Sequence, residues 1–297
     1  MKKFVLLILL FPLFGKSQFL DNSKGTAFSE IPFFNEQFVK NNKIKSLKGT
    51  YTFKKMGDIM RETDLVFQYD FDTKGHLTQS FETNIENQKI DTNLLIYSYN
   101  NSGNLAFVRK KNQTGYYSTH YFYDSNNRII KEEYRRDIDT AGTFFVPSFE
   151  RSLILNFETF KYETNGKSEK AIVHNSYGFP YKEIISSLDS SGYLISKEEK
   201  LKFGNQIITY KYDYNDKGWI SNFKILNFKD SKMNQEIRFK YDEFGNLIEK
   251  HIYKNNRFVT DIQVIYNLKT GLISSILTRD VSTNFISILR FEVVKFF

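Results

Sequence analysis

The fold is decided by the stretch Tyr241-Asp242-Glu243-Phe244-Gly245-Asn246-Leu247, because its pattern recurs along most of the chain. The pattern is an aromatic residue, Asp or Asn, two free positions, Gly, one free position and an aliphatic residue. Asp or Asn can accept hydrogen bonds from backbone N–H groups just ahead of it, and Gly adopts the left-handed conformation that closes a type I turn with a bulge. The pattern therefore predicts a hairpin turn, with the aromatic and the aliphatic residue facing each other across two antiparallel strands.

Copies of this turn recur at a regular interval. The glycine position of the turn is occupied by Gly75, Gly103, Asn127, Gly166, Gly192, Gly218, Gly245 and Gly271. Asn tolerates the left-handed conformation better than most residues other than Gly, so Asn127 fits the pattern. From Gly192 to Gly271 the interval is 26 or 27 residues, whereas Asn127 and Gly166 are 39 residues apart. This longer interval indicates one insertion, a longer hairpin tip or an extra excursion.

Between the turns, apolar and polar residues alternate. Ile237, Phe239 and Tyr241 fall on one face of a strand and Arg238 falls on the other, as expected when one face packs on a core and the other meets water. Each unit of about 26 residues is two strands joined by two turns. We therefore predict an all-β fold over residues 44–297, an antiparallel meander of about eight β-hairpin repeats that forms an elongated or curled sheet.

One segment of the predicted sheet breaks this alternation. In residues 129–136 charges fall on both faces, with Lys131 and Glu133 on one and Glu132 and Arg136 on the other. We expect such strand ends to project beyond the core into solvent.

The chain begins with a predicted targeting segment. Lys2 and Lys3, an apolar run over residues 4–14 and small residues up to Ser17 predict a secretory signal peptide over residues 1–17,. The apolar run is too short to span a bilayer. The protein is therefore expected to be extracytoplasmic, in the periplasm, at the cell surface or secreted.

Residues 18–43 lie outside the repeat. Ser29 and the residues after it could open a short helix that places Ile31, Phe34 and Phe38 on one face. This N-terminal segment is expected to act as a plug or cap for the first hairpin.

The composition limits the classes of function. Cysteine is absent and the formal net charge is +8, so disulfides and thiolate chemistry are excluded, and the modest charge excess does not indicate nucleic-acid binding. The sequence contains no nucleophile elbow, phosphate loop or dinucleotide turn. The four histidines, His76, His120, His174 and His251, are not at metal-ligand spacing, and we expect them to be exposed on strands or turns,. A protein that is not an enzyme and uses no cofactor or metal is expected.

The repeated aromatic-Asp turn followed by Gly-Asn-Leu resembles the Rhs/YD-repeat family of bacterial secreted and surface proteins. The resemblance covers residues 64–272. It implies a strand-rich ribbon that can coil into a shell, with a binding or structural role outside the cytoplasm. Large members of the family enclose a C-terminal toxin, whereas this chain has few repeats and we expect no toxin domain after Gly271.

The repeated aromatic residues provide the candidate ligand site. If the tyrosine side chains face outward, they could stack on sugar rings, whereas side chains that face inward would form the core of the sheet. The tyrosines alternate with charged residues, which favours the inward position. We select Trp219, Tyr193 and Tyr116 as speculative ligand-binding residues, although packing is the simpler role for Trp219. Carbohydrate or a cell-surface or envelope protein is the expected partner, with no nucleic acid and no integral membrane span.

Three hypotheses follow. The first is a secreted or envelope-associated, non-catalytic YD-repeat protein that binds or scaffolds. The alternative is an outer-membrane β-barrel, which strands near ten residues, the signal peptide and the terminal Phe297 favour, while charges on both strand faces oppose it. The third is an enzyme whose site is built on the insertion at residues 137–149.

Overall fold

The computed structural model describes residues 18–86, 89–112, 114–140 and 148–297, and the predicted signal peptide lies outside them. The described part forms an 18-stranded sheet with one α-helix and one short 3-10 helix. The helices are α1 (Glu36–Asn41) and η1 (Ser231–Met233). The strands are β1 (Ile44–Lys54), β2 (Met60–Phe71), β3 (Leu77–Glu86), β4 (Lys89–Tyr99), β5 (Leu105–Asn112), β6 (Gly115–Tyr123), β7 (Ile129–Asp139), β8 (Phe149–Asn165), β9 (Ser168–His174), β10 (Pro180–Leu188), β11 (Leu194–Leu201), β12 (Ile207–Tyr214), β13 (Ile220–Asn227), β14 (Gln235–Tyr241), β15 (Leu247–Lys254), β16 (Arg257–Tyr266), β17 (Ile273–Asp280) and β18 (Ile286–Phe296).

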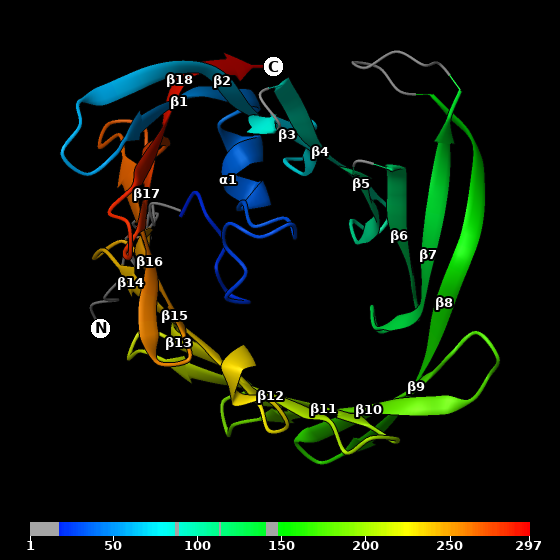
Figure 1. Cartoon of the computed structure of the whole chain (residues 1–297). Helices are drawn as coiled ribbons and strands as arrows, with labels where there is room; N and C mark the ends of the chain where they lie inside the picture. Colours follow the sequence, from blue (N-terminus) through cyan, green and yellow to red (C-terminus); the bar gives the residue numbers. More distant parts are fainter. Residues whose placement is uncertain (1–17, 87–88, 113, 141–147) are drawn as a thin grey trace, which may run out of the picture.

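The sheet closes into a barrel (Figure 1). Each strand pairs antiparallel with the next, and β18 returns to pair with β1 from Ile44↔Phe296 to Lys54↔Ile286. The predicted all-β antiparallel meander is confirmed, but the open elongated or curled sheet is wrong. Closure satisfies the backbone groups that two edge strands would leave unpaired, and it gives the barrel architecture of the alternative hypothesis.

The repeat turns lie at one end of the barrel, where each even-numbered strand from β2 to β16 leads to the next strand. In the turn at residues 241–247, the Asp242 carboxylate accepts hydrogen bonds from the backbone N–H groups of Phe244 and Asn246, at 2.9 and 2.8 Å. Gly245 has φ 86° and Asn127 has φ 59°. The predicted turn chemistry is confirmed at these positions.

The leading tyrosines of the turns make a hydrogen bond that the sequence pattern did not reveal. Each hydroxyl donates to the backbone carbonyl of the aliphatic residue of the preceding turn. The pairs are Tyr99–Leu77, Tyr123–Leu105, Tyr162–Ile129, Tyr214–Leu194, Tyr241–Ile220 and Tyr266–Leu247, at 2.7–3.0 Å. Neighbouring repeats are thus connected by side-chain hydrogen bonds as well as by strand pairing. This explains why the leading position of these turns is occupied by Tyr and not by Phe.

The N-terminal segment, residues 18–43, lies inside the barrel against the wall (Figure 1). Its aromatic residues Phe19, Phe34 and Phe38 pack together and are buried. Helix α1 begins after the N-cap Asn35, later than predicted, and Ile31 is 49% exposed. The segment therefore fills part of the interior and contributes to a core that extends well beyond the first hairpin.

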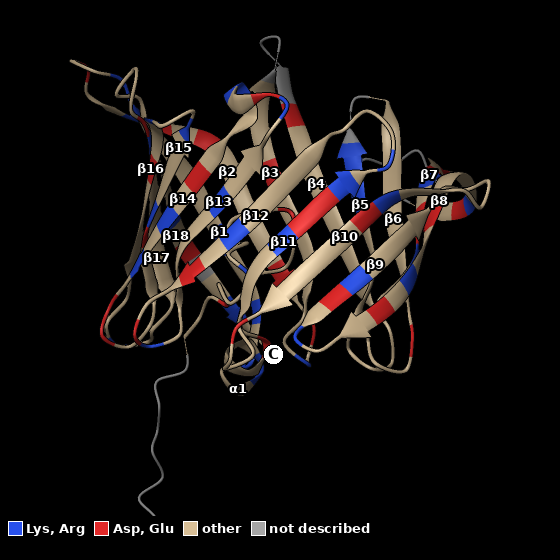
Figure 2. Cartoon of the chain, turned by 90° about the horizontal axis from the view of Figure 1, so that it is seen from below, with Lys and Arg blue, Asp and Glu red and all other residues tan. Residues whose placement is uncertain are grey.

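The wall has an apolar inner face beside this segment and a charged outer face. On β14, Ile237 and Phe239 are buried in the core, while Glu236 and Arg238 alternate with them on the outside. Figure 2 shows charged residues distributed over many strands of the wall. None of the helices in the described ranges is long and apolar enough to cross a membrane.

The segment with charges on both faces lies in β7, within the closed wall but outside the core cluster, and Tyr134 is exposed there, as predicted. Glu133 is an exception, because it is only 3% exposed and pairs with Lys131 and Arg135. The insertion lengthens the hairpin of β7 and β8, and residues 141–147 of its tip lie outside the described residues.

Candidate ligand site

A pocket of about 550 Å³ opens at the turn end of the barrel, between the N-terminal segment and β11–β14. Five aromatic side chains line it: Tyr193, Tyr212, Tyr214, Trp219 and Tyr241. Polar residues of the N-terminal segment, including Asp21, Asn22 and Lys24, form the opposite side. The pocket therefore combines aromatic surfaces with hydrogen-bonding groups.

The repeat itself builds the aromatic side. At two turns, the residue after the turn glycine packs on the leading tyrosine of the next turn, with ring centroids 4.8 Å apart for Tyr193 and Tyr214 and 5.3 Å apart for Trp219 and Tyr241. A Cβ atom on Gly218 would collide with the Tyr193 hydroxyl, and one on Gly245 would collide with the Trp219 indole. These two glycines thus provide the left-handed turn and also the space in which the aromatic ring that follows the preceding turn glycine lies,.

The polar side is held in place by hydrogen bonds. Asn22 is buried, donates to the Tyr241 hydroxyl at 2.8 Å and accepts from the backbone N–H of Ala27 at 3.0 Å. Burial raises the pKa of Tyr241 to about 12, so its hydroxyl remains protonated at neutral pH and donates to the Ile220 carbonyl. Asn22 therefore couples the N-terminal segment to the repeat at the pocket wall.

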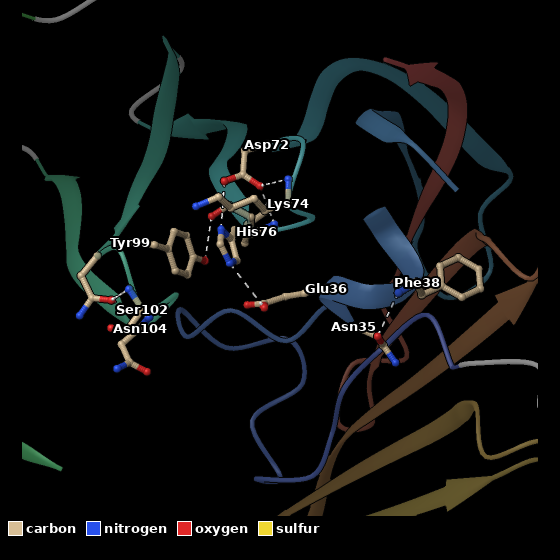
Figure 3. Close-up of polar contacts among 11 residues, drawn as sticks. Asn35, Glu36, Phe38, Asp72, Lys74, His76, Tyr99, Ser102 and Asn104 are labelled. Carbon is tan, nitrogen blue, oxygen red and sulfur yellow. Dashed lines mark hydrogen bonds and ion pairs between the residues drawn. The ribbon is translucent and has the colours of Figure 1, made fainter. Parts of the chain in front are cut away.

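The same turn geometry places His76 at a second contact with the N-terminal segment (Figure 3). The imidazole stacks on Tyr99 at 4.3 Å between ring centroids, and its Nδ1 lies 3.0 Å from Asp72 Oδ2. Its Nε2 lies 3.6 Å from a Glu36 carboxylate oxygen on α1. His76 is only 6% exposed, so the prediction of an exposed histidine is wrong here, because α1 covers this turn.

Tyr116, the third residue selected from the sequence, lies far from this pocket, and its ring packs on Phe149. It is 8% exposed. Its strand neighbour is Asp137, whose carboxylate accepts from Arg109 at 2.6 Å and from Ser152 at 2.7 Å. Burial alone would raise the pKa of Asp137, but hydrogen bonds from these partners lower it overall.

The interior beyond the N-terminal segment contains a group of charged residues. The Glu158 carboxylate accepts a hydrogen bond from the Tyr181 hydroxyl, and its Oε2 lies 3.5 Å from Lys182 Nζ. Glu132 is cross-strand from Glu158, and its pKa is raised by burial and by that neighbouring carboxylate. In the described part of the chain, no three His, Cys, Asp or Glu side chains are arranged to hold a metal ion.

Sequence reasoning found Trp219 and Tyr193, which the structure brings together in one pocket. It missed the contribution of Asp21, Asn22 and Lys24, since nothing in a local pattern indicates that a segment outside the repeat returns to the turns. The position after the turn glycine was an available signal, because Tyr193 and Trp219 both occupy it.

No protein-family model matches this chain, and no curated protein matches it. Among solved structures, it is similar to a porin-like protein from Bacteroides uniformis, with 11% identity, 84% of this chain and 97% of that chain covered, and a TM-score of 0.39. A porin-like protein from Bacteroides vulgatus gives 9% identity, 71% and 95% coverage, and a TM-score of 0.32.

The similarity to TcdB2-TccC3 without its hypervariable C-terminal region has 13% identity and a TM-score of 0.21. It covers 75% of this chain but only 14% of that one. At such low scores and identities, these similarities establish neither a shared function nor membership of a family.

Proposed function

We propose that this chain is a non-catalytic YD-repeat barrel of the cell envelope or the extracellular space that binds carbohydrate in the pocket at its turn end. The observation that carries this proposal is the aromatic lining of that pocket opposite polar side chains of the N-terminal segment. Sugar rings have an apolar C–H face and a rim of hydroxyl groups, so they match a site that combines aromatic rings with hydrogen-bonding groups.

The two sides of the pocket have different roles in this proposal. Tyr193 is 42% exposed and offers a ring to a ligand, while Trp219 lies beside it, over Gly245. Asp21 and Lys24 are exposed and can exchange hydrogen bonds with hydroxyl groups. Catalysis is not needed for this function, because the pocket binds by shape and hydrogen bonding alone.

The single tryptophan makes the test direct. Trp219 is the only tryptophan of the chain, so its fluorescence reports on this pocket. Titration with oligosaccharides chosen from a glycan array should change the emission and saturate. Tyr193→Ala should weaken binding about tenfold or more, as expected for loss of one ring contact, whereas Tyr177→Ala, at an 84% exposed position on another turn, should leave it unchanged. No saturable response to any glycan would refute the proposal.

An outer-membrane β-barrel is the second candidate, and the closed ring of 18 antiparallel strands favours it,. The outer charges oppose it. Lys240 lies 2.7 Å from Glu249, and Arg279 lies 3.0 Å from Asp261, on the face opposite the core residues of the same strands. A Lys or Arg facing lipid at the bilayer midplane costs about 2–4 kcal/mol, and an aqueous exterior avoids this cost.

Fractionation separates the two candidates. The aqueous barrel should be recovered from periplasm or medium without detergent. Recovery only from detergent-solubilised outer membrane, with heat-modifiable mobility in gels, would support the membrane barrel.

A further inference from the structure

The wall of the barrel has one long stretch of strand with a free edge. Strand β8 pairs with β7 along most of its length, from Phe149 to Thr159. On its other side it pairs with β9 only from Thr159 to Asn165. Within the described residues, the edge of β8 over residues 149–158 therefore has no neighbouring strand, and β8 extends past the end of β9 (Figure 1).

Large apolar side chains are exposed along this edge. Leu153, Ile154 and Leu155 are each more than half exposed. The β9–β10 turn follows directly on the last residue that pairs with β8, and it exposes Tyr177 and Phe179. Natural edge strands are usually protected by charges, proline or a covering element. The centre of this edge, residues 153–155, is apolar and not covered, which instead favours the addition of another strand,.

The edge carries charges that are complementary under a two-fold rotation. When two copies of β8 lie antiparallel with the axis between Ile154 and Leu155, Arg151 of each copy lies opposite Glu158 of the other. The side chains of Arg151 and Glu158 lie on the inner face of β8. Their partners on β7, Ile138 and Glu132, are six residues apart, and residues separated by an even number lie on the same face of a strand,. This register ends at Glu158, just before β9 begins to cover β8.

We propose that β8 is a self-association edge, on which residues 151–158 pair antiparallel with the same residues of a second copy of this chain. The pairing would satisfy the free backbone groups of both copies and cover the apolar stretch, as in a two-fold symmetric dimer. This surface is separate from the aromatic pocket at the turn end, so dimer formation and ligand binding can be measured independently.

Sedimentation velocity on the purified protein over a range of concentrations tests the proposal. The native chain should show a concentration-dependent monomer–dimer equilibrium. Leu155→Lys should weaken dimer formation tenfold or more, because it places two like charges at the edge. Ile195→Lys is the matched control, since Ile195 is also an exposed aliphatic residue, on β11, which has a strand on each side. It should leave the equilibrium unchanged.

A charge exchange tests the register. Arg151→Glu and Glu158→Arg should each weaken the homodimer, because each puts like charges opposite each other, whereas an equimolar mixture of the two variants should dimerise as a heterodimer. Circular dichroism checks that each variant keeps the melting temperature of the native chain. Glu158→Arg removes the hydrogen bond from the Tyr181 hydroxyl. If this variant unfolds for that reason, the result for Leu155→Lys decides the proposal. A native chain that stays monomeric, an equal effect of Leu155→Lys and Ile195→Lys, or an edge that binds only strands of other proteins would overturn the proposal.

Discussion

Two parts of the barrel share one repeat and one wall but differ in what lies against their inner faces. The filled half, β1–β3 and β13–β18, packs on the N-terminal segment, and its inner residues are the buried aliphatic and aromatic side chains of the core. Within the described ranges, the open half, β6–β11, contributes no residue to this core cluster, although Ala171 and Val173 of β9 are buried. Its inner residues include Glu132, Glu158 and Tyr134, and Tyr134 is 44% exposed.

This difference shows that the repeat determines the wall and the N-terminal segment determines the core. The turn hydrogen bonds occur in both halves, as in Tyr162–Ile129 and Tyr266–Leu247. Residues 18–43 cover the largest apolar area of the inner face, which gains the free energy of apolar burial there,. The stability of the protein should therefore depend unevenly on its two halves.

The largest expected effect is at Phe19, which is fully buried between Phe34 and Phe38. Phe19→Ala should lower the free energy of unfolding by about 3–5 kcal/mol, because it removes buried area and leaves a cavity. Tyr134→Ala in the open half should cost less than about 1 kcal/mol. Urea denaturation of both variants measures the difference. Equal losses would show that the open half also has a water-excluding core.

The second effect distinguishes a buried cation from a solvated one. Lys250 faces the core, is 7% exposed and donates to the Ala27 carbonyl at 2.7 Å, and burial lowers its pKa to about 8. The unfolded chain binds this proton up to about pH 10.4, so the folded chain carries fewer protons between pH 8 and 10.4 and its stability rises with pH there. The full gain is about 3 kcal/mol.

Lys250→Met should remove this gain, so the difference in unfolding free energy between native chain and variant should change by about 3 kcal/mol from pH 8 to 10.4. Lys197→Met is the comparison in the open half, where Lys197 pairs with Glu199 at 2.8 Å. Because this ion pair is partly exposed, Lys197→Met should change the free energy of unfolding only slightly,. A parallel curve for Lys250→Met would mean that its ammonium group is solvated.

The sequence predicted the wall better than its contents. Gly245 and Asp242 have a local function, since a turn depends on residues a few positions apart, and the all-β meander followed from such turns. Closure depends on β1 meeting β18, and no local pattern encodes that contact. The pocket was predicted in part, because Trp219 and Tyr193 belong to the repeat. Asn22 could not be assigned, because its partner Tyr241 is 219 residues away.

A smaller effect compares one hydrogen bond in two environments. Tyr266 packs against the core in the filled half, whereas Tyr162 lies in the open half outside that core. Tyr266→Phe should cost about 1–2 kcal/mol, because it leaves the Leu247 carbonyl unsatisfied near apolar side chains, and Tyr162→Phe should cost about 0.5 kcal/mol, because water can replace the hydroxyl. Thermal unfolding of the two variants measures both values. A larger loss at Tyr162 would contradict the proposed difference in solvation.

The smallest effect concerns the outer face, where filled and open halves should behave alike. Lys240 is paired with Glu249, and its side chain is 62% exposed. In water, Lys240→Ala should change the free energy of unfolding by little more than the error of a denaturation experiment, and added salt should reduce that change, because exposed ion pairs are weak and screened. Lys170→Ala, which removes the pair with Glu183 on the outer face of the open half, should give the same result. A loss well above this error that salt does not reduce would mean that this face is shielded from water. Such shielding is expected for a membrane barrel and not for the aqueous barrel proposed here.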